Sequence, residues 1–407
     1  MRLPSWHRFP DRFTIVFGAV ALLLLVLELI NGRFWLNDFR VYYDSARSLL
    51  HGDPLYGVAH GLDSGIFKYA PVMAMLYVPL ALLPYGVAAT IQYLLITAAF
   101  IGASILADRL IRTHLLRGRA GSYAPLFLTV LVMVVHLHRE LHLGNINVML
   151  LCLLLWALER LVSGKRTVAG ALIGLAIIAK PHFTILLPLL LVRREWKATL
   201  AAIAVPVIGV ALPALFLGLQ GNWELHRAWL GEMARHNASL IYTGGDNYTA
   251  VNTVYSFLHR TLLKHFLGGP TALEAMCILG VIAAGSGAFV LRNIMRGTPN
   301  GIVIEYLLLL ALVPSLTLTD TEHFLFSLPV VAYVVFHLVP RADPRWAAII
   351  AVPLLAGLGG NWEDALGPAS EWMIHFGVLG MANVGLILWA TFLYCRSNPE
   401  RNGTSYP

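Results

Sequence analysis

The chain has little charge and little cysteine. Only 13% of its 407 residues are charged and 58% are apolar, whereas a soluble domain is about 25% charged. This composition excludes an ordinary soluble domain. The three cysteines, Cys152, Cys277 and Cys395, lie far apart and show no CxxC spacing. Neither a disulfide framework nor a metal cluster is therefore indicated.

Apolar runs of near 20 residues recur from one end of the chain to the other. Backbone amides inside lipid need partners within the chain, so these runs predict an all-α, multispanning transmembrane helical bundle. The first run follows three arginines but precedes no small-residue cleavage site, so we expect a retained helix. We treat residues 1–407 as a single membrane domain. About twelve spans are expected, at residues 13–31, 86–107, 122–137, 146–162, 167–180, 182–192, 198–218, 270–291, 301–318, 324–339, 346–359 and 372–394.

The basic residues predict the orientation of these spans. The net charge of +7 is explained by topology and not by nucleic-acid binding, because the charges gather in short loops between spans. An excess of lysine and arginine marks cytoplasmic loops. We therefore expect a multi-pass protein of the plasma (bacterial inner) membrane, with both termini cytoplasmic. The inner basic loops would be 109–119, 160–166, 193–197, 292–296 and 341–345.

A polar, aromatic-rich stretch, residues 32–69, follows the first apolar run. The next segment, 69–84, is apolar but short, and Pro71, Pro79 and Pro84 interrupt it. Parity of the crossings argues against a full span here, so we expect a re-entrant or tilted helix. Residues 32–84 then form a first outer loop with amphipathic and re-entrant helices. Most histidines and acids also fall on the outer face, which predicts an active site there.

Asp38 is the strongest candidate for catalysis. It stands in LNDFRVYY, close to the expected end of the first span, where partial desolvation and the neighbouring Arg40 suit a general base. The alternative is an aspartate that caps a helix beginning at Phe39. Asp44 and Arg47 are expected to form a surface pair.

Cations and amides in two later segments could bind a substrate. Lys180 closes an apolar helix, where it either snorkels to the interface or binds an anion such as phosphate, with His182 beside it. The stretch HLHRELHLGNIN offers further ligands. The spacing of His138 and His142 also fits zinc, but no third ligand is identifiable, so we expect no metal. The candidates of this stretch are Arg139, His142, Asn145 and Asn147.

Two outer segments complete the candidates. His323, in TLTDTEHF, could orient or protonate a substrate group, or it is a loop histidine with structural partners. The long outer loop, 219–269, is rich in aromatic residues and amides, including Asn247 and Tyr248. Aromatic faces beside amides suit a sugar, although aromatic residues also form the interfacial belt of membrane proteins.

The first outer loop, NDFRVYYDSARSLLHGDPLYG followed by FKYAPVMAMLYVPLALLP, resembles the opening of the polyprenol-phosphate-mannose-dependent mannosyltransferases of glycosyltransferase family 87, in the GT-C superfamily. LHLGNINVMLLCLLLWAL is similar to the G-Q-x-N stretch of that family, and AIIAKPHFTILLPLLLVRREW to its lysine-proline stretch. LTDTEHFLFSLP also resembles a family segment. Asn145 stands where the family usually has glutamine.

The resemblance implies an inverting glycosyltransferase. Its donor would be a polyprenyl-phosphate sugar, with mannose as the expected sugar, and its acceptor would be a glycolipid or glycan on the outer side of the membrane. Asp38 would be the catalytic aspartate, Lys180 and His182 would lie near the lipid phosphate, and His323 would face the same cavity. No cofactor is expected beyond the lipid-linked donor, and the other partners are membrane lipids. The alternative is a transporter or flippase of a lipid-linked sugar.

Overall fold

The structure is a computed structural model that describes residues 11–61, 65–116, 124–242, 252–267, 272–298, 300–316, 320–339 and 345–397. The described residues are almost all helical, apart from a single isolated bridge between Ala59 and Ile66. The chain forms two compact units, each assembled from segments that are distant in sequence. The prediction of an all-α, multispanning protein is confirmed.

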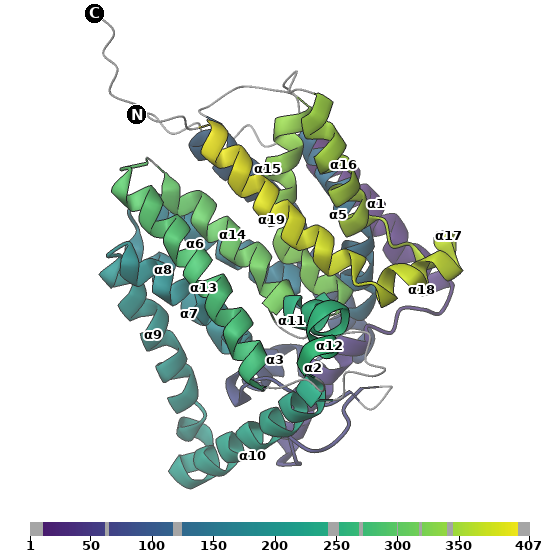
Figure 1. The fold of residues 1–407 in the computed structure, drawn as a ribbon. Coiled ribbons are helices and arrows are strands. Elements are labelled where there is room, and N and C mark those ends of the chain that lie inside the picture. The colour runs from purple at the N-terminus through teal and green to yellow at the C-terminus, as the bar shows by residue number, and fades with distance from the viewer. Residues whose placement is uncertain are drawn as a thin grey trace, which may run out of the picture. The chain divides into compact units, whose positions relative to one another are not determined.

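The first unit comprises residues 1–106, 137–190 and 195–239. It holds the candidate site. Its helices, in chain order (Figure 1), are α1 (Asp11–Ile30), α2 (Asn37–His51), α3 (Pro71–Ala81), most of α4 (Tyr85–Leu110), the end of α5 (Ala124–Leu143), α6 (Asn147–Val162), α7 (Arg166–Ala179), the 3-10 helix η2 (Pro181–Ile185), most of α8 (Leu186–Val192), α9 (Trp196–Ala211) and most of α10 (Ala214–Tyr242).

The second unit comprises residues 107–136, 191–194 and 240–407. It contains the beginning of α5 and a long series of other helices. These are η1 (Ile111–Leu115), α11 (Val254–Leu258), η4 (His259–Leu263), α12 (Lys264–Leu267), α13 (Ala272–Met295), α14 (Gly301–Leu316), η5 (Thr321–Ser327), α15 (Leu328–Leu338), α16 (Arg345–Gly359), α17 (Glu363–Leu366), α18 (Pro368–His375) and α19 (Val378–Ser397).

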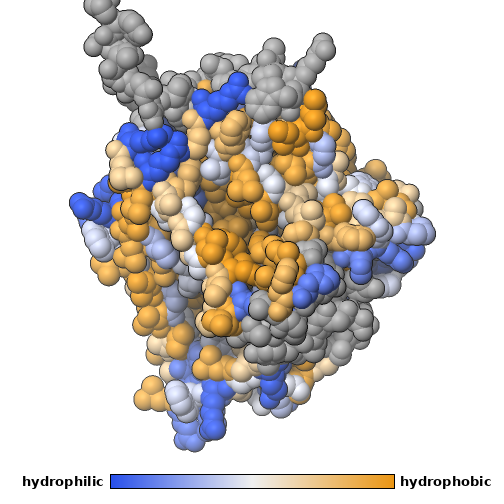
Figure 2. Space-filling model, in the orientation of Figure 1, coloured by the Kyte–Doolittle hydropathy of each residue, from blue (hydrophilic) through white to orange (hydrophobic). Residues whose placement is uncertain are grey.

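Among the described residues, six helices are long and apolar enough to cross a membrane, and a seventh crossing is counted if the bent pair α9 and α10 forms one span. Five further apolar helices have 10–17 residues. Twelve crossings therefore remain a prediction. Exposed leucine, isoleucine and valine side chains line α9 and α13, and Figure 2 shows hydrophobic residues along both. Such a surface suits contact with lipid.

The structure corrects two expected boundaries. The helix α5 continues through the polar stretch HLHRELHL to Leu143, so these residues are not an outer loop. The first half of the expected long outer loop, 219–269, is helical, because α10 runs to Tyr242 after a break at Gly218. Both segments keep helical backbone hydrogen bonds although their mean hydropathy is low, and a span search by hydropathy ends too early on such helices.

The short helix expected at 69–84 is present as α3. Pro71 occupies its first turn, where the missing N–H costs no hydrogen bond. The helix packs against α2, and ring contacts join Phe39 and Tyr42 of α2 to Tyr77 of α3 at centroid distances of 6.1 and 5.0 Å. Tyr43 donates to the carbonyl oxygen of Leu83 at 2.7 Å. The amphipathic α2 is therefore held against an apolar helix that is too short for an ordinary span.

The helices α7 and α9 pack so closely that only glycine fits at one position. A Cβ at Gly170 would lie 2.0 Å from the carbonyl oxygen of Ala198. We expect Gly170→Ala to lower the free energy of unfolding by about 1–3 kcal/mol, because the two backbones must separate. Thermal melting in detergent measures this. Gly18→Ala is the control, since a Cβ there meets nothing within 4 Å; equal melting temperatures for the two variants would contradict the prediction.

Candidate functional site

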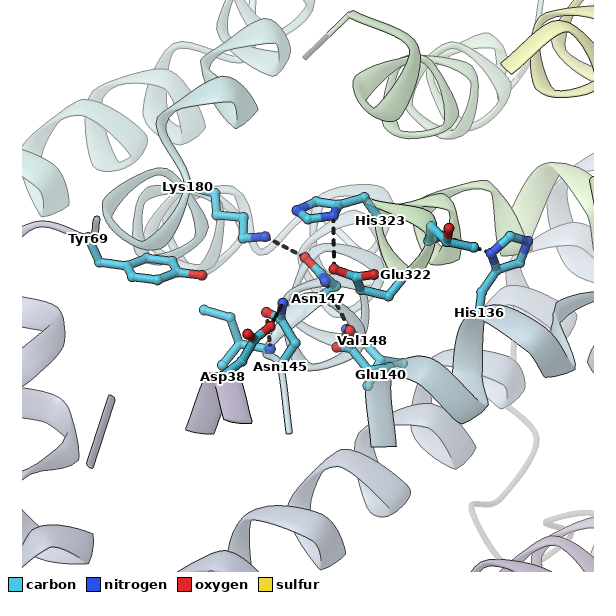
Figure 3. Close-up of polar contacts among 12 residues, drawn as sticks. Asp38, Tyr69, His136, Glu140, Asn145, Asn147, Val148, Lys180, Glu322 and His323 are labelled. Carbon is cyan, nitrogen blue, oxygen red and sulfur yellow. Dashed lines mark hydrogen bonds and ion pairs between the residues drawn. The ribbon is translucent and has the colours of Figure 1, made fainter. Parts of the chain in front are cut away.

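Asp38 lies in the first turn of α2, where the partial positive charge of a helix N-terminus favours a carboxylate. Leu36 precedes the helix in a left-handed conformation, with φ of 45°. The helix begins at Asn37, so the alternative that Asp38 caps a helix beginning at Phe39 is wrong. The side chain is half-buried. Its Oδ2 accepts a hydrogen bond from Nδ2 of Asn145 at 2.6 Å (Figure 3).

The amide of Asn145 has a chemically defined orientation. Its Oδ1 accepts the backbone N–H of Ile146 at 2.7 Å and the hydroxyl of Tyr42 at 3.1 Å. A backbone N–H only donates, so the oxygen must lie on that side and the NH₂ group must face Asp38. Because Tyr42 donates to Asn145, the Tyr69 hydroxyl is the donor in their 2.8 Å contact. A directed chain of hydrogen bonds thus ends on the Asp38 carboxylate.

Burial raises the pKa of Tyr42 and of Tyr69 well above the usual value, and the nearby Asp38 carboxylate raises both further. Both phenols are therefore protonated at neutral pH. They serve as hydrogen-bond donors and not as bases, so Asp38 and not either tyrosine is the candidate proton acceptor here.

Gly144 allows the turn between α5 and α6 to reach α2. Its φ is +72°, and a Cβ there would lie 2.8 Å from Cβ of Phe39 and 2.9 Å from Cβ of Leu36. The carbonyl oxygen of Gly144 accepts a hydrogen bond from Nε2 of Gln92 at 3.2 Å. The glycine of the GNIN sequence therefore brings Asn145 to Asp38 through close backbone approach.

A second amide joins two buried charged groups. Asn147 donates through Nδ2 to Oε2 of Glu140 at 2.9 Å, and its Oδ1 accepts from Nζ of Lys180 at 2.5 Å. The other oxygen of Glu140 accepts the backbone N–H of Val148 at 2.8 Å. Glu140 is fully buried and Lys180 is 7% exposed. Figure 3 shows this second set of contacts, which centres on Asn147, two residues after Asn145.

Lys180 stands at a break in the backbone. It follows the last residue of α7 in an extended conformation, with φ of −139° and ψ of 102°, as expected for a residue before proline. Its ammonium group is buried, so snorkelling to the interface does not describe it. His182, on η2, is half-buried and makes an edge-to-face contact with Phe183 at a centroid distance of 4.6 Å.

Arg40 does not contact Asp38. Its Nε lies 3.3 Å from Oδ2 of Asp44, and its guanidinium lies over the ring of Tyr85 at 4.7 Å. The expected pair of Asp44 with Arg47 is therefore wrong. Arg47 instead lies over the ring of Tyr43 at 5.9 Å. Since one helical turn separates Arg40 from Asp44, their pairing is the ordinary i, i+4 contact.

The remaining candidates on α5 are Arg139 and His142. Nδ1 of His142 is 3.4 Å from Oε2 of Glu28, and the ring stacks on His138 at 6.2 Å. Arg139 is exposed. No group of three potential ligands is placed to hold a metal ion within the described part of the chain, and the absence of a metal stays a prediction.

Three candidates fall elsewhere. His323 belongs to the second unit, on η5, where its Nδ1 lies 3.5 Å from Oε1 of the buried Glu322. Asn247 and Tyr248 lie outside the described residues. Their predicted roles are therefore not tested.

Three residues of the site were not predicted from the sequence: Tyr42, Tyr69 and Glu140. The tyrosines resemble the other aromatic residues of a membrane interface. Glu140 carried a usable signal. It lies on α5 after a long apolar run, and an acid in such a helix is costly without partners.

Two known proteins are similar to this chain over most of its length. A polyprenol-phosphate-mannose-dependent alpha-(1-2)-phosphatidylinositol pentamannoside mannosyltransferase of Mycobacterium tuberculosis is 24% identical over 392 residues, which cover 92% of this chain and 84% of that protein. Its counterpart from Mycolicibacterium smegmatis is 23% identical over 367 residues, 88% and 82% of the two chains.

A third relative, an alpha-(1->3)-arabinofuranosyltransferase of Corynebacterium glutamicum, is 29% identical over 185 residues, and the match spans 44% of this chain and 42% of that protein. Residues 67–319 match glycosyltransferase family 87. This range includes Tyr69, both asparagines and Lys180, and covers more than half of the chain. The chain therefore belongs to glycosyltransferase family 87 and is a membrane glycosyltransferase.

Proposed function

We propose that the chain is an inverting glycosyltransferase that moves mannose from a polyprenyl-phosphate donor to a glycolipid or glycan acceptor, with Asp38 as the general base. The observation that carries the proposal is the directed hydrogen bond from Asn145 to the half-buried Asp38 carboxylate. Mannose is favoured because the two relatives that match over most of this chain are named mannosyltransferases.

The proposed step is a single displacement. The acceptor hydroxyl oxygen attacks the anomeric carbon, the bond from that carbon to the phosphate oxygen breaks, and polyprenyl phosphate leaves. The hydroxyl proton passes to Asp38. Since a lipid phosphate is already a good leaving group at neutral pH, the enzyme needs a base for the acceptor and a cation for the developing phosphate charge.

Lys180 supplies that cation in our proposal. Its ammonium has three N–H donors, of which Asn147 accepts one. The group lies at a backbone break beside His182, which we propose as a further contact to the donor. Arg40, Arg139, His142 and His323 were also predicted to bind substrate, and for them the geometry gives no comparable support.

The active site would face the outer side of the membrane. This assignment depends on the basic loops, which place the N-terminus of α2 and the turn between α5 and α6 on the opposite side from the cytoplasm. Both termini would be cytoplasmic. The acceptor would then be a glycolipid or glycan exposed at the outer leaflet.

Purified protein in proteoliposomes tests the proposal. Synthetic polyprenyl-phosphate mannose and candidate glycolipid acceptors are added, and sugar transfer is followed together with release of polyprenyl phosphate. We expect both products in equal amounts. Movement of the intact donor across the bilayer without transfer would instead support the transporter alternative and would contradict the proposal.

Asn145 variants test how Asp38 is held. We expect Asn145→Ala to lower kcat/KM by about 10- to 100-fold, because Asp38 loses a hydrogen bond to a charged acceptor. Asn145→Asp should lower it further, since it places a second carboxylate beside Asp38. Initial rates at low donor concentration measure both. Asn222→Ala, on α10, is the control; an Asn145→Asp variant that is as active as Asn145→Ala would contradict the role of the NH₂ group.

A further inference from the structure

Glu140 is a buried carboxylate beside the site, and both its oxygens accept N–H donors, one from Asn147 and one from Val148. We propose that Glu140 is a positioning residue for transfer: it fixes the direction of the Asn147 amide so that a carbonyl oxygen, and not an NH₂ group, meets Lys180. The inference rests on the proposed function, in which Lys180 binds the donor phosphate.

The direction of the Asn147 amide is set from the Glu140 side. A side-chain amide has an oxygen and an NH₂ group of almost the same size, so packing alone does not distinguish its two orientations. A carboxylate only accepts hydrogen bonds. Since Glu140 offers an oxygen at 2.9 Å, the NH₂ group must point to it and the carbonyl oxygen must point to Lys180.

The backbone of α6 requires one oxygen from residue 140, which limits how the side chains of residues 140 and 147 can pair. The N–H of Val148 donates to Oε1 of Glu140 and keeps that oxygen occupied. If residue 140 were glutamine, its only oxygen would be needed by Val148, and its NH₂ group would face Asn147. Two donors would then oppose each other. The Asn147 amide would turn over and present its NH₂ group to the Lys180 ammonium, where it repels the cation.

The Asn147 amide bridges the Glu140 carboxylate and the Lys180 ammonium. In our proposal the carboxylate stabilises the buried ammonium across this bridge.

Exchanging the two polar groups tests the proposal. In the double variant Glu140→Gln/Asn147→Asp, Val148 still donates to residue 140, residue 140 donates to residue 147, and Lys180 still meets an oxygen. The sizes and the net charge are unchanged. We expect Glu140→Gln alone to lower kcat/KM for the donor by about 10- to 100-fold. Asn147→Asp alone should lower it similarly, because two carboxylates then oppose each other. The double variant should restore transfer to within about threefold of wild type.

The role of Lys180 is tested by a double-mutant cycle. If Glu140 acts through Lys180, Glu140→Gln should have little further effect in a Lys180→Gln background. Equal fold losses in both backgrounds would overturn the proposal. Glu159→Gln, on α6 beside Arg160, is the control and should be as active as wild type.

Size-exclusion profiles and melting temperatures in detergent separate folding from positioning. A folded double variant that remains as inactive as Glu140→Gln would overturn the proposal, even if the single variants fail to fold. Failure of the wild type to transfer any sugar would instead count against the proposed function. Restored transfer in the exchanged variant, with both single variants impaired, is the result that we expect.

Discussion

Asp38→Asn is expected to lower the rate of sugar transfer by about 10²- to 10⁴-fold, the contribution typical of a general base. The substitution keeps the size of the side chain and leaves an oxygen that can accept the hydrogen bond from Asn145. It removes only the ability to take a proton at neutral pH. We therefore expect normal folding, nearly unchanged KM for the donor and a large loss of kcat. Steady-state assays in proteoliposomes separate these constants.

The same helix offers a matched control for Asp38. Asp44 lies on α2 and pairs with Arg40 through an i, i+4 contact on a partly exposed surface, where such pairs contribute little to stability. Asp44→Asn should retain nearly full activity. Comparable losses for the two variants would show that α2 tolerates no change of charge and would remove the special role of Asp38.

Lys180→Gln has the second-largest expected effect. We expect a loss of about 10²- to 10³-fold in kcat/KM, because a cation that stabilises the developing phosphate charge is removed from a buried site. Unlike Asp38→Asn, this variant should also bind the donor more weakly. Binding of a non-transferable polyprenyl-phosphate analogue, measured beside the rate of transfer, distinguishes the two residues.

A lysine at the other end of the same helix provides the comparison. Lys165 precedes α7 and is exposed, so Lys165→Gln removes one positive charge without touching the site. It should change transfer by less than about twofold, in line with a screened surface charge. Unchanged donor binding by Lys180→Gln would contradict the assignment of Lys180 to the donor phosphate.

Much of the fold could be predicted because its physical cause is local. Long apolar runs predict helices independently of the rest of the sequence. Pro71 and Pro79 interrupt one such run and indicated that the helix there, α3, is short. The C-terminal end of α5 and the part of α10 beyond Gly218 were missed for the converse reason. Their polar residues lower the hydropathy, although the backbone remains helical through Leu143 and Tyr242.

The site could be predicted only in part. Asp38 and Lys180 were identified because a charged group beside an apolar run needs an explanation. Their partners were not assigned, because Asn145 follows Asp38 by 107 positions and no local pattern joins them. The direction of each amide depends on hydrogen bonds from backbone groups such as the N–H of Ile146, which exist only in the folded chain.

The stereochemistry of transfer tests the role of Asp38 most directly. A donor of known anomeric configuration is incubated with the wild-type protein and an acceptor, and the configuration of the new glycosidic bond is read by NMR. If Asp38 is a base in a single displacement, the product has the opposite configuration to the donor. Retained configuration would exclude a single back-side displacement and would contradict the account.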